Sequence, residues 1–300
     1  RVGLRADFDA LPIQEKTGLS CSSQNPGVMH ACGHDVHSAL LLGAAHILLE
    51  LKDTFDGSVK LISQPAEEDA GTPGSKKMIA GGVLENPKMD AIFAQHTWPL
   101  LPVGKIGIRN GAMMAASDRF YITVHGKNSH GSAPENGIDA IVIAAQIISA
   151  LQSIVSRNVG PLDSCVLTIG TIKGGNRYNV IADEVYMEGT CRNLSPAVRD
   201  KMPERMEKII KGVAEGMGGW AELRYDLCYS PLINDPALFE MEKQVIIDTV
   251  GEDGLVIPEQ SALGGEDFSH YCKLLPTCFT YLGVQDESKP YFPLHNGEYA

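Results

Sequence analysis

The order of the apolar segments between Arg119 and Cys228 constrains the fold more than any other feature of the sequence. Four segments have the composition of half-buried strands and two carry apolar residues at helical spacing. They follow one another as strand, helix, strand, strand, helix and strand, which is the order of a ferredoxin-like unit. The predicted bounds are residues 119–125, 138–155, 165–172, 184–192, 196–217 and 222–228.

The segments on either side of this unit predict a different architecture. Strand-like runs at residues 2–8, 59–63 and 91–95 alternate with a long apolar helix at 34–51, which is typical of an α/β sheet covered by helices. This helix is apolar on nearly all sides, so we expect most of its surface to be buried. We predict a larger α/β domain in two parts, residues 1–113 and 230–300, with a smaller domain, residues 114–229, inserted between them.

The composition disfavours several classes of function. The 300 residues, 44% of them hydrophobic, suffice for the cores of about two domains. With 37 acidic and 25 basic residues, the net charge of −12 disfavours binding to nucleic acid or to an anionic membrane surface. We take residues 39–49 as the most apolar stretch of the sequence, and this stretch is far shorter than the ~20 residues of a membrane span. Seven cysteines without a Cys-x-x-Cys pair predict reduced thiols and a cytoplasmic location.

The densest group of potential metal ligands lies between His30 and His37. This segment reads His-Ala-Cys-Gly-His-Asp-Val-His, and a cysteine thiolate with nearby imidazoles suits zinc and similar metals. Gly33 leaves the backbone free to turn Cys32 and His34 toward one point. Taken alone, the segment is more simply explained by a buried cysteine beside helix-capping residues, so a metal site needs further donors.

Two more predicted strands lead into side chains that can bind a metal or accept a proton. Glu67 and Glu68 follow the strand at 59–63, and His96 is predicted to end the strand at 91–95. Ligands of α/β folds lie at the carboxyl ends of strands. One of two adjacent carboxylates can bind metal while the other accepts a proton from water. Each feature alone also has a structural explanation, as a helix start or a structural histidine. His295 is a fourth donor.

These motifs resemble those of the metal-dependent aminoacylase and carboxypeptidase family. The segments that carry the resemblance are residues 5–12, 29–37, 64–68 and 265–268, and the similarity covers essentially the whole chain. Within the family, the chain is most similar to the amidohydrolase branch that includes hippurate hydrolase, indole-acetyl-amino-acid hydrolases and N-acetyl-diaminopimelate deacetylase. The resemblance implies a zinc-peptidase-like catalytic α/β domain with an inserted ferredoxin-like domain that acts as a lid and in dimerisation.

The resemblance also implies two divalent metal ions per subunit, of zinc, manganese, cobalt or nickel, and a role for each of several residues. Glu67 is implied as general base, and His130 as the group that stabilises the oxyanion in the neighbouring subunit's site. Asn179 and Arg192 are implied to contact the substrate, and Arg192 is implied to bind the carboxylate of the substrate. The implied metal ligands are Cys32, His34, Glu68, His96 and His295, with Cys32 as a bridge between the ions.

The activity that the resemblance implies is hydrolysis of the amide bond of an N-acyl amino acid, such as hippurate or an N-acetyl amino acid, by a homodimer. Three positions depart from the family pattern: Ala182 replaces a proline, Gly265 replaces a serine, and Gly297-Glu298-Tyr299 replaces Pro-x-Phe after Asn296. The family also has N-terminal helices, a first strand and a C-terminal helix that this chain lacks. We therefore expect the natural protein to be longer.

Two other classes of function stay open from the sequence. A thiol hydrolase would use Cys32 as nucleophile and His34 or His96 as base, although no nucleophile turn is recognisable. A catalytically silent homologue would keep the fold as a binding protein, and the presence of both Glu67 and Glu68 argues against it. No glycine-rich signature for a dinucleotide or a phosphate loop occurs.

Overall fold

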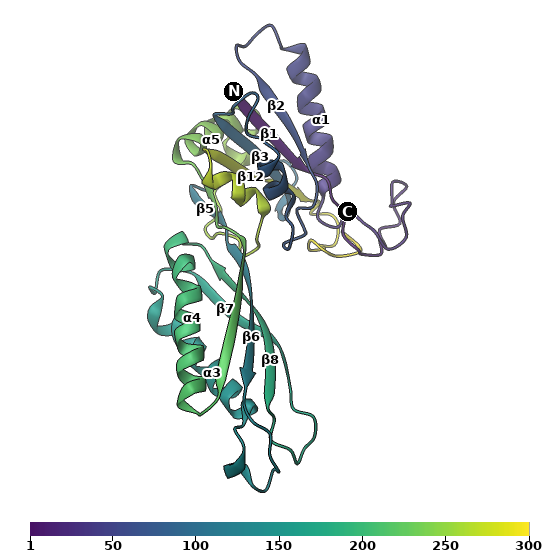
Figure 1. Cartoon of the computed structure of the whole chain (residues 1–300). Coiled ribbons are helices and arrows are strands. Elements are labelled where there is room, and N and C mark those ends of the chain that lie inside the picture. The colour runs from purple at the N-terminus through teal and green to yellow at the C-terminus, as the bar shows by residue number, and fades with distance from the viewer. Residues whose placement is uncertain (300) are drawn as a thin grey trace. The chain divides into compact units, whose positions relative to one another are not determined.

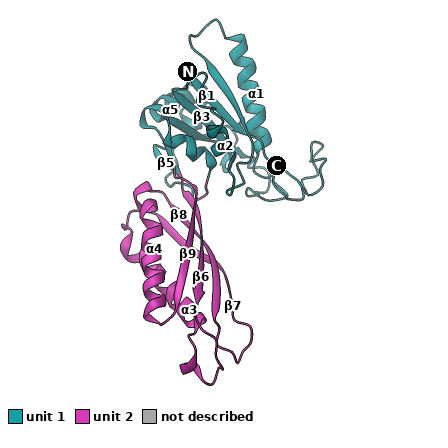
Figure 2. Ribbon diagram, viewed as in Figure 1, with its two compact units in different colours: residues 1–113, 232–262, 266–300 teal, residues 114–231, 263–265 magenta. Residues whose placement is uncertain are grey.

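The computed structural model describes residues 1–299, and the chain forms two units (Figure 2). Unit 1 comprises residues 1–113, 232–262 and 266–300, and unit 2 comprises residues 114–231 and 263–265. The chain therefore leaves unit 1 to build unit 2 and then returns to complete unit 1. The predicted α/β fold class is confirmed, and the role of unit 2 as a lid stays a prediction.

Unit 1 is built on a six-stranded sheet with the strand order β11-β4-β12-β3-β1-β2 (Figure 1). Strands β2, β1, β3 and β12 are parallel, and β4 is antiparallel to β12. Because β2 and β3 lie on opposite sides of β1, the strand order reverses at β1, which is where α/β sheets bind ligands. The bounds are β1 Val2–Asp7, β2 Val59–Gln64, β3 Ala91–Pro102, β4 Ile106–Gly107, β11 Leu255–Val256 and β12 Thr277–Gln285.

Helices lie on both faces of this sheet. Helices α1 (His34–Glu50) and α5 (Pro236–Val250) lie on the face that carries Phe93. Helix α2 (Gly74–Ala80) and the 3-10 helix η4 (Asp267–Lys273) lie on the other face. There the backbone N–H group of Ser75 in α2 donates to the side chain of Asp267, the first residue of η4. Strands β5 (Gly111–Met114) and β10 (Leu232–Asn234) form a separate two-stranded sheet, which belongs to unit 1 except for Met114.

The prediction that the first helix is mostly buried is wrong. Only His34 and His37 of α1 are buried, whereas Leu42, Ile47 and Leu49 are 71%, 57% and 68% exposed. The reason is that α1 contacts the sheet along one stripe, and none of the described residues forms a second layer over its outer side. The apolar composition of this helix therefore does not indicate how many of its sides pack against other elements.

Unit 2 has a four-stranded antiparallel sheet in the order β7-β8-β6-β9, with helices α3 and α4 on one face (Figure 1). The core between the helices and the sheet includes Phe120, Ile147 and Met206. Helix α4 begins at Pro196, which suits the first turn of a helix. The bounds are β6 Ala116–His125, α3 Ala140–Ser153, β7 Cys165–Gly174, β8 Glu184–Asn193, α4 Pro196–Gly216 and β9 Trp220–Tyr229, in the predicted order.

The side chains of β6 alternate between the two faces of this sheet. Asp118 and Phe120 are buried beneath the helices, whereas Ser117, Arg119 and Tyr121 face the opposite side. Asp118 accepts two hydrogen bonds from the guanidinium group of Arg199 in α4, at 2.6 and 2.8 Å. This buried pair ties α4 to the sheet and leaves the face that carries Arg119 uncovered by the helices of unit 2.

A second apolar segment, longer than residues 39–49 and not singled out from the sequence, lies in unit 2. Within Ala140–Asn158, 18 consecutive residues have a mean hydropathy of 1.6, so this segment could span a membrane by length and composition alone. In the structure, Ile143, Ile147 and Leu151 on one side of this segment are buried in the core of unit 2. The segment is therefore a core helix with a partly exposed apolar outer side.

Candidate active site

Five side chains with metal-binding donor atoms meet at the carboxyl ends of the parallel strands of unit 1. The donor atoms of Cys32, His34 and His96 lie within 4.8 Å of one another, and so do those of Cys32, Glu68 and His295. The two groups share Cys32. The structure thus brings together all five of the predicted ligands.

His96 does not end its strand, as the sequence analysis predicted, but lies in the middle of β3. The strand continues to Pro102 because β12 pairs with it from Ile92 to Trp98 and, after a register shift, again at Pro102. The register places Arg5 of β1 opposite Ala94, so His96 is level with Asp7, the last residue of β1. His96 is available to the site because the neighbouring strand stops there.

Gly33 makes the turn that presents Cys32 and His34. Its φ angle of 78° is in the left-handed region, and a Cβ atom at this position would overlap Oγ1 of Thr97. Oγ1 of Thr97 in turn donates a hydrogen bond to the carbonyl oxygen of Cys32 at 3.1 Å. A residue other than glycine would therefore displace either the turn or β3.

The surroundings of His34 fit a bound metal ion. Its Nδ1 atom lies 3.0 Å from the carbonyl oxygen and 3.1 Å from Oδ1 of Asp9. Its Nε2 atom is buried and forms no hydrogen bond with any described residue. Against the effect of burial, the hydrogen bond to Asp9 and the charge of Asp7 raise the pKa of His34 to about 9. A cation is thus favoured at this nitrogen, and a divalent ion can take the place of the proton.

The other two ligands of the first group have unusual proton affinities. Burial, with the charge of His37, lowers the pKa of His96 to about 3, so its imidazole is neutral. Its Nδ1–H group donates to the carbonyl oxygen of Thr97 at 2.6 Å, which directs the lone pair of Nε2 toward Cys32, whose Sγ lies 3.5 Å away. Burial and the charge of Glu68 raise the pKa of the Cys32 thiol well above its ordinary value. Such a thiol is not an activated nucleophile, which disfavours a thiol hydrolase.

His295 belongs to a loop near the C-terminus and completes the second group. Its backbone N–H group donates to the carbonyl oxygen of Ala31 at 2.7 Å, and its φ angle is 62°. Nε2 of His295 lies 3.0 Å from Oε1 of Glu68. A left-handed conformation at a residue other than glycine is typical of functional sites.

Glu67 is buried beside the two donor groups. The backbone N–H group of Asp267 donates to its Oε1 atom at 3.3 Å. Burial and the negative charges of Glu266 and Asp267 raise the pKa of Glu67 well above its ordinary value. A carboxylate with a raised proton affinity suits a general base.

A cluster of charged side chains that was not predicted from the sequence surrounds Glu67. The guanidinium group of Arg5 donates to Asp7 at 2.8 Å, to Glu266 at 3.0 Å and to Asp267 at 2.8 Å. The side-chain amide of Gln64 also donates to Asp267, at 2.7 and 2.9 Å. The signal that could have found this cluster is an arginine within a buried strand, which needs buried anionic partners.

His37 is close to the predicted ligands but serves a different purpose. Its Nδ1–H group donates to Asp7, and its Nε2 atom accepts a hydrogen bond from the backbone N–H group of Thr97 at 2.9 Å. Both ring nitrogens are thus engaged with the protein. His37 links the end of β1 to β3 and orients Asp7.

The three other predicted residues, His130, Asn179 and Arg192, lie in unit 2. Nδ1 of the exposed His130 accepts a hydrogen bond from the backbone N–H group of Ser132 at 3.1 Å. In the neutral imidazole the proton is therefore on Nε2, which can act as a donor. The carbonyl oxygen of Asn179 accepts a hydrogen bond from Gly131, so Asn179 lies beside His130. Arg192 lies on the outward face of β8, and the structure gives no contact between it and these two.

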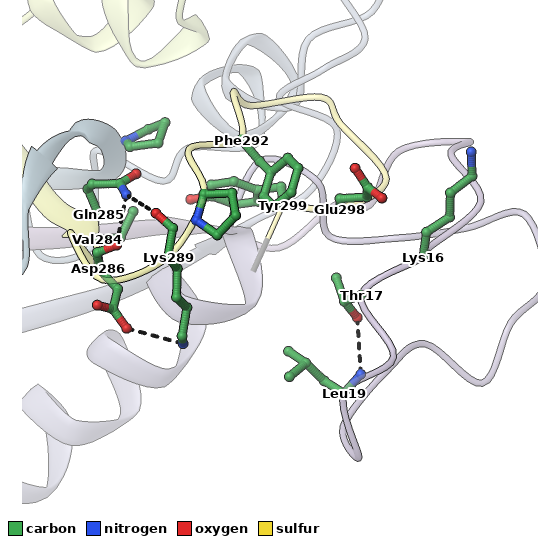
Figure 3. A pocket seen from close by; sticks show the side chains of 12 residues that line it. Lys16, Thr17, Leu19, Val284, Gln285, Asp286, Lys289, Phe292, Glu298 and Tyr299 are labelled. Carbon is green, nitrogen blue, oxygen red and sulfur yellow. Dashed lines mark hydrogen bonds and ion pairs between the residues drawn. The ribbon is translucent and has the colours of Figure 1, made fainter.

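A hollow of about 290 Å³ lies next to the C-terminal loop of unit 1 (Figure 3). The hydroxyl group of Tyr299, which lines it, donates to Oγ1 of Thr97 at 3.1 Å and so connects the hollow to the strand that carries His96. Residues from both ends of the chain line the hollow, among them Lys16, Thr17, Leu19, Lys289, Phe292 and Glu298.

Replacing Gly33 tests whether the turn holds the site together. We expect Gly33→Ala to lower the free energy of unfolding by ~2 kcal/mol or more, because a left-handed alanine and its contact with Thr97 are both unfavourable. Gly43→Ala is the matched control, since Gly43 lies in α1 with open space around it and should gain ~0.5–1 kcal/mol. Urea denaturation measures both, and equal stability of Gly33→Ala and the unaltered protein would contradict this role.

The sequence matches the model of a known protein family over residues 3–298, described as peptidase family M20/M25/M40. It is 41% identical to an N-acetyl-L-cysteine deacetylase of Bacillus subtilis over 97% of this chain and 68% of that protein. It is 46% identical to an N-acyl-L-amino acid amidohydrolase of Geobacillus stearothermophilus over 78% of this chain and 62% of that protein.

A solved structure gives the same similarity in three dimensions. A Bacillus subtilis protein described as a dinuclear metal binding peptidase from the M20 family superimposes with a TM-score of 0.85 and 36% sequence identity. The match covers all of this chain and 75% of that one.

Proposed function

Because the chain belongs to peptidase family M20/M25/M40, we propose that it hydrolyses the amide bond of N-acyl amino acids with the help of two divalent metal ions. It is a hydrolytic enzyme that acts on amides. The observation that carries the proposal is the pair of donor groups that share Cys32, with the buried Glu67 beside them.

The residues present fit two metal ions. Cys32, His34 and His96 would hold one, and Cys32 with Glu68 and His295 would hold the other. A mixed set of thiol, imidazole and carboxylate donors suits zinc, manganese, cobalt or nickel. When bound, such ions lower the pKa of water and polarise the carbonyl group of the substrate.

Glu67 performs the proton transfers in this proposal. Its carboxylate takes a proton from the attacking water and later returns a proton to the leaving amine. The hydrogen bond from the backbone of Asp267 fixes one carboxylate oxygen, and the raised proton affinity of Glu67 favours the first transfer. The adjacent Glu68 binds metal, so the two carboxylates divide the roles.

Unit 2 supplies the contacts to the substrate in this proposal. Nε2–H of His130 donates to the oxyanion, since the backbone of Ser132 occupies Nδ1. Oδ1 of Asn179 has no hydrogen-bond partner among the described residues and can accept one from the substrate. Arg192 binds the carboxylate of the amino-acid part. Hippurate and N-acetyl amino acids are the substrates to test.

We also propose that two copies of the chain associate through unit 2. Strand β7 is at an edge of the sheet and pairs on one side only with a described strand. Ile172 on this strand and Ile141 and Val142 on α3 are exposed to about half of their surface. A second copy can extend the sheet there and bury these side chains. All seven cysteines are free, which supports a cytoplasmic location.

Replacing Glu67 tests the mechanism. We expect Glu67→Gln to lower kcat on an N-acetyl amino acid by about 10²- to 10⁴-fold, because the amide cannot accept the proton. The metal content should stay that of the unaltered protein. Asp69→Asn is the matched control, since Asp69 is exposed and contacts only its own turn. Activity within a few-fold of the unaltered enzyme, or a loss of metal that accounts for the loss of activity, would contradict this assignment.

Mixing two inactive variants tests whether His130 acts in the partner's site. Dimers that combine one Glu67→Gln chain with one His130→Ala chain contain one complete site if His130 acts across the interface. After equal mixing we expect about a quarter of the unaltered activity. If His130 acts within its own chain, every site lacks one group and the mixture stays inactive, which would contradict the proposed arrangement.

A further inference from the structure

The uncovered face of the unit 2 sheet carries two arginines that form no ion pair with any described residue. Arg119 of β6 and Arg192 of β8 face away from the helices, because their neighbours Asp118, Phe120 and Cys191 are buried. Both arginines line one hollow of about 380 Å³. The lining also includes Ser117, Thr168, Thr190 and the acidic Glu188.

The register of the strands brings the two guanidinium groups to one place. Ser117 lies opposite Arg192, and Arg119 lies opposite Thr190. The two arginines therefore occupy diagonal positions of neighbouring strands, where long side chains reach each other. Thr168 on β7 is opposite Thr190 and adds a hydroxyl group from a third strand.

The carboxylates near these arginines are already engaged. Asp118 is on the buried side, where it accepts two hydrogen bonds from Arg199. Glu188, the acidic residue that lines the hollow, is diagonal to Arg119 in the strand register and interacts with the hydroxyl group of Tyr186, but it forms no ion pair with either arginine. Burial lowers the pKa of the Arg192 guanidinium group, the charge of Asp118 opposes this effect, and the charge of Arg119 acts in the same direction as burial. Two guanidinium groups that line one hollow and form no ion pair with a described residue favour a bound anion.

Arg224 shows how an arginine on this face is neutralised when its role is structural. Its guanidinium group donates to Asp226 of the same strand at 2.8 and 3.0 Å. It also lies over the ring of Tyr121 at 4.9 Å from the centroid. Arg119 has neither kind of partner, so the difference between the two arginines points to a ligand.

We propose that Arg119 and Arg192 form a subsite for two carboxylates and that the preferred substrates are N-acyl derivatives of dicarboxylic amino acids. This rests on the proposed function, in which Arg192 binds the α-carboxylate, and it assigns the side-chain carboxylate to Arg119. The planar fork of each guanidinium group matches a carboxylate, and the hydroxyl groups of Ser117 and Thr168 can donate further hydrogen bonds, whereas that of Thr190 donates to the carbonyl oxygen of Asp118 at 2.8 Å.

Two substrates that differ in a single group test the proposal. N-acetylglutamate and N-acetylglutamine have nearly the same shape, but only the first carries a second carboxylate. We expect the metal-loaded enzyme to favour N-acetylglutamate in kcat/KM. Arg119→Gln should reduce this preference about ten- to a hundredfold, mainly through KM, because one charge-assisted contact is lost. Arg224→Gln is the matched control and should leave the preference unchanged.

A binding measurement separates this proposal from the proposed function. Titration calorimetry of N-acetylglutamate with the Glu67→Gln protein should give a Kd that Arg119→Gln raises by a similar factor. Equal kcat/KM of the unaltered enzyme for the two substrates would overturn the subsite. An equal loss of kcat/KM on both substrates in Arg119→Gln would also overturn it, because both arginines would then bind the same carboxylate. Absence of hydrolysis of any N-acyl amino acid would instead contradict the proposed function, and the calorimetric comparison still decides the subsite.

Discussion

The guanidinium group of Arg5 is the interaction on which the site of unit 1 depends. It joins the end of β1 to residues 266 and 267, which lie more than 250 positions later in the sequence, through three carboxylates. Removing one partner of such a buried ion pair typically lowers the free energy of unfolding by ~3–5 kcal/mol, because the remaining charge is left buried without a partner. Arg5 also hydrogen-bonds Oε1 of Gln64 at the end of β2. Three separate segments are thus fixed by one side chain at the point where the strand order reverses.

The balance of charge around Arg5 explains why this place suits cations. Besides Asp7, Glu266 and Asp267, the site contains Glu67 and Glu68, so negative groups outnumber the single guanidinium group. Burial, despite the opposing charge of Arg5, raises the pKa of Glu266 to about 8. The imidazoles of His34, His96 and His295 add neutral or cationic nitrogen donors at the same strand ends. A divalent ion relieves this excess of negative charge, which neither side-chain pairing nor solvent does in a buried site.

The sequence predicted the parts of this arrangement that depend on local pattern. Strand and helix spacing predicted the α/β class, and the motifs around Cys32, Glu67 and His96 predicted which side chains meet. It did not predict that β3 continues past His96, because Pro99 in the following segment argues against a strand and only pairing with β12 extends it. Contacts between residues distant in sequence determine the partners of Arg5. Strand register places Arg119 and Arg192 on diagonal positions. Neither can be read from the pattern of residues along the chain. The exposure of α1 depends on what packs over it, which composition does not report.

Metal content and catalysis measured together test the central claim most directly. The protein is stripped with a chelator and titrated with zinc or manganese, while bound metal is counted by mass spectrometry and hydrolysis of an N-acetyl amino acid is followed. The account predicts two ions per chain and an activity that disappears with the metal and returns with it. Activity that survives chelation would contradict it and favour a thiol hydrolase, and a stripped protein that takes up no metal at the Cys32 site would contradict it at its root.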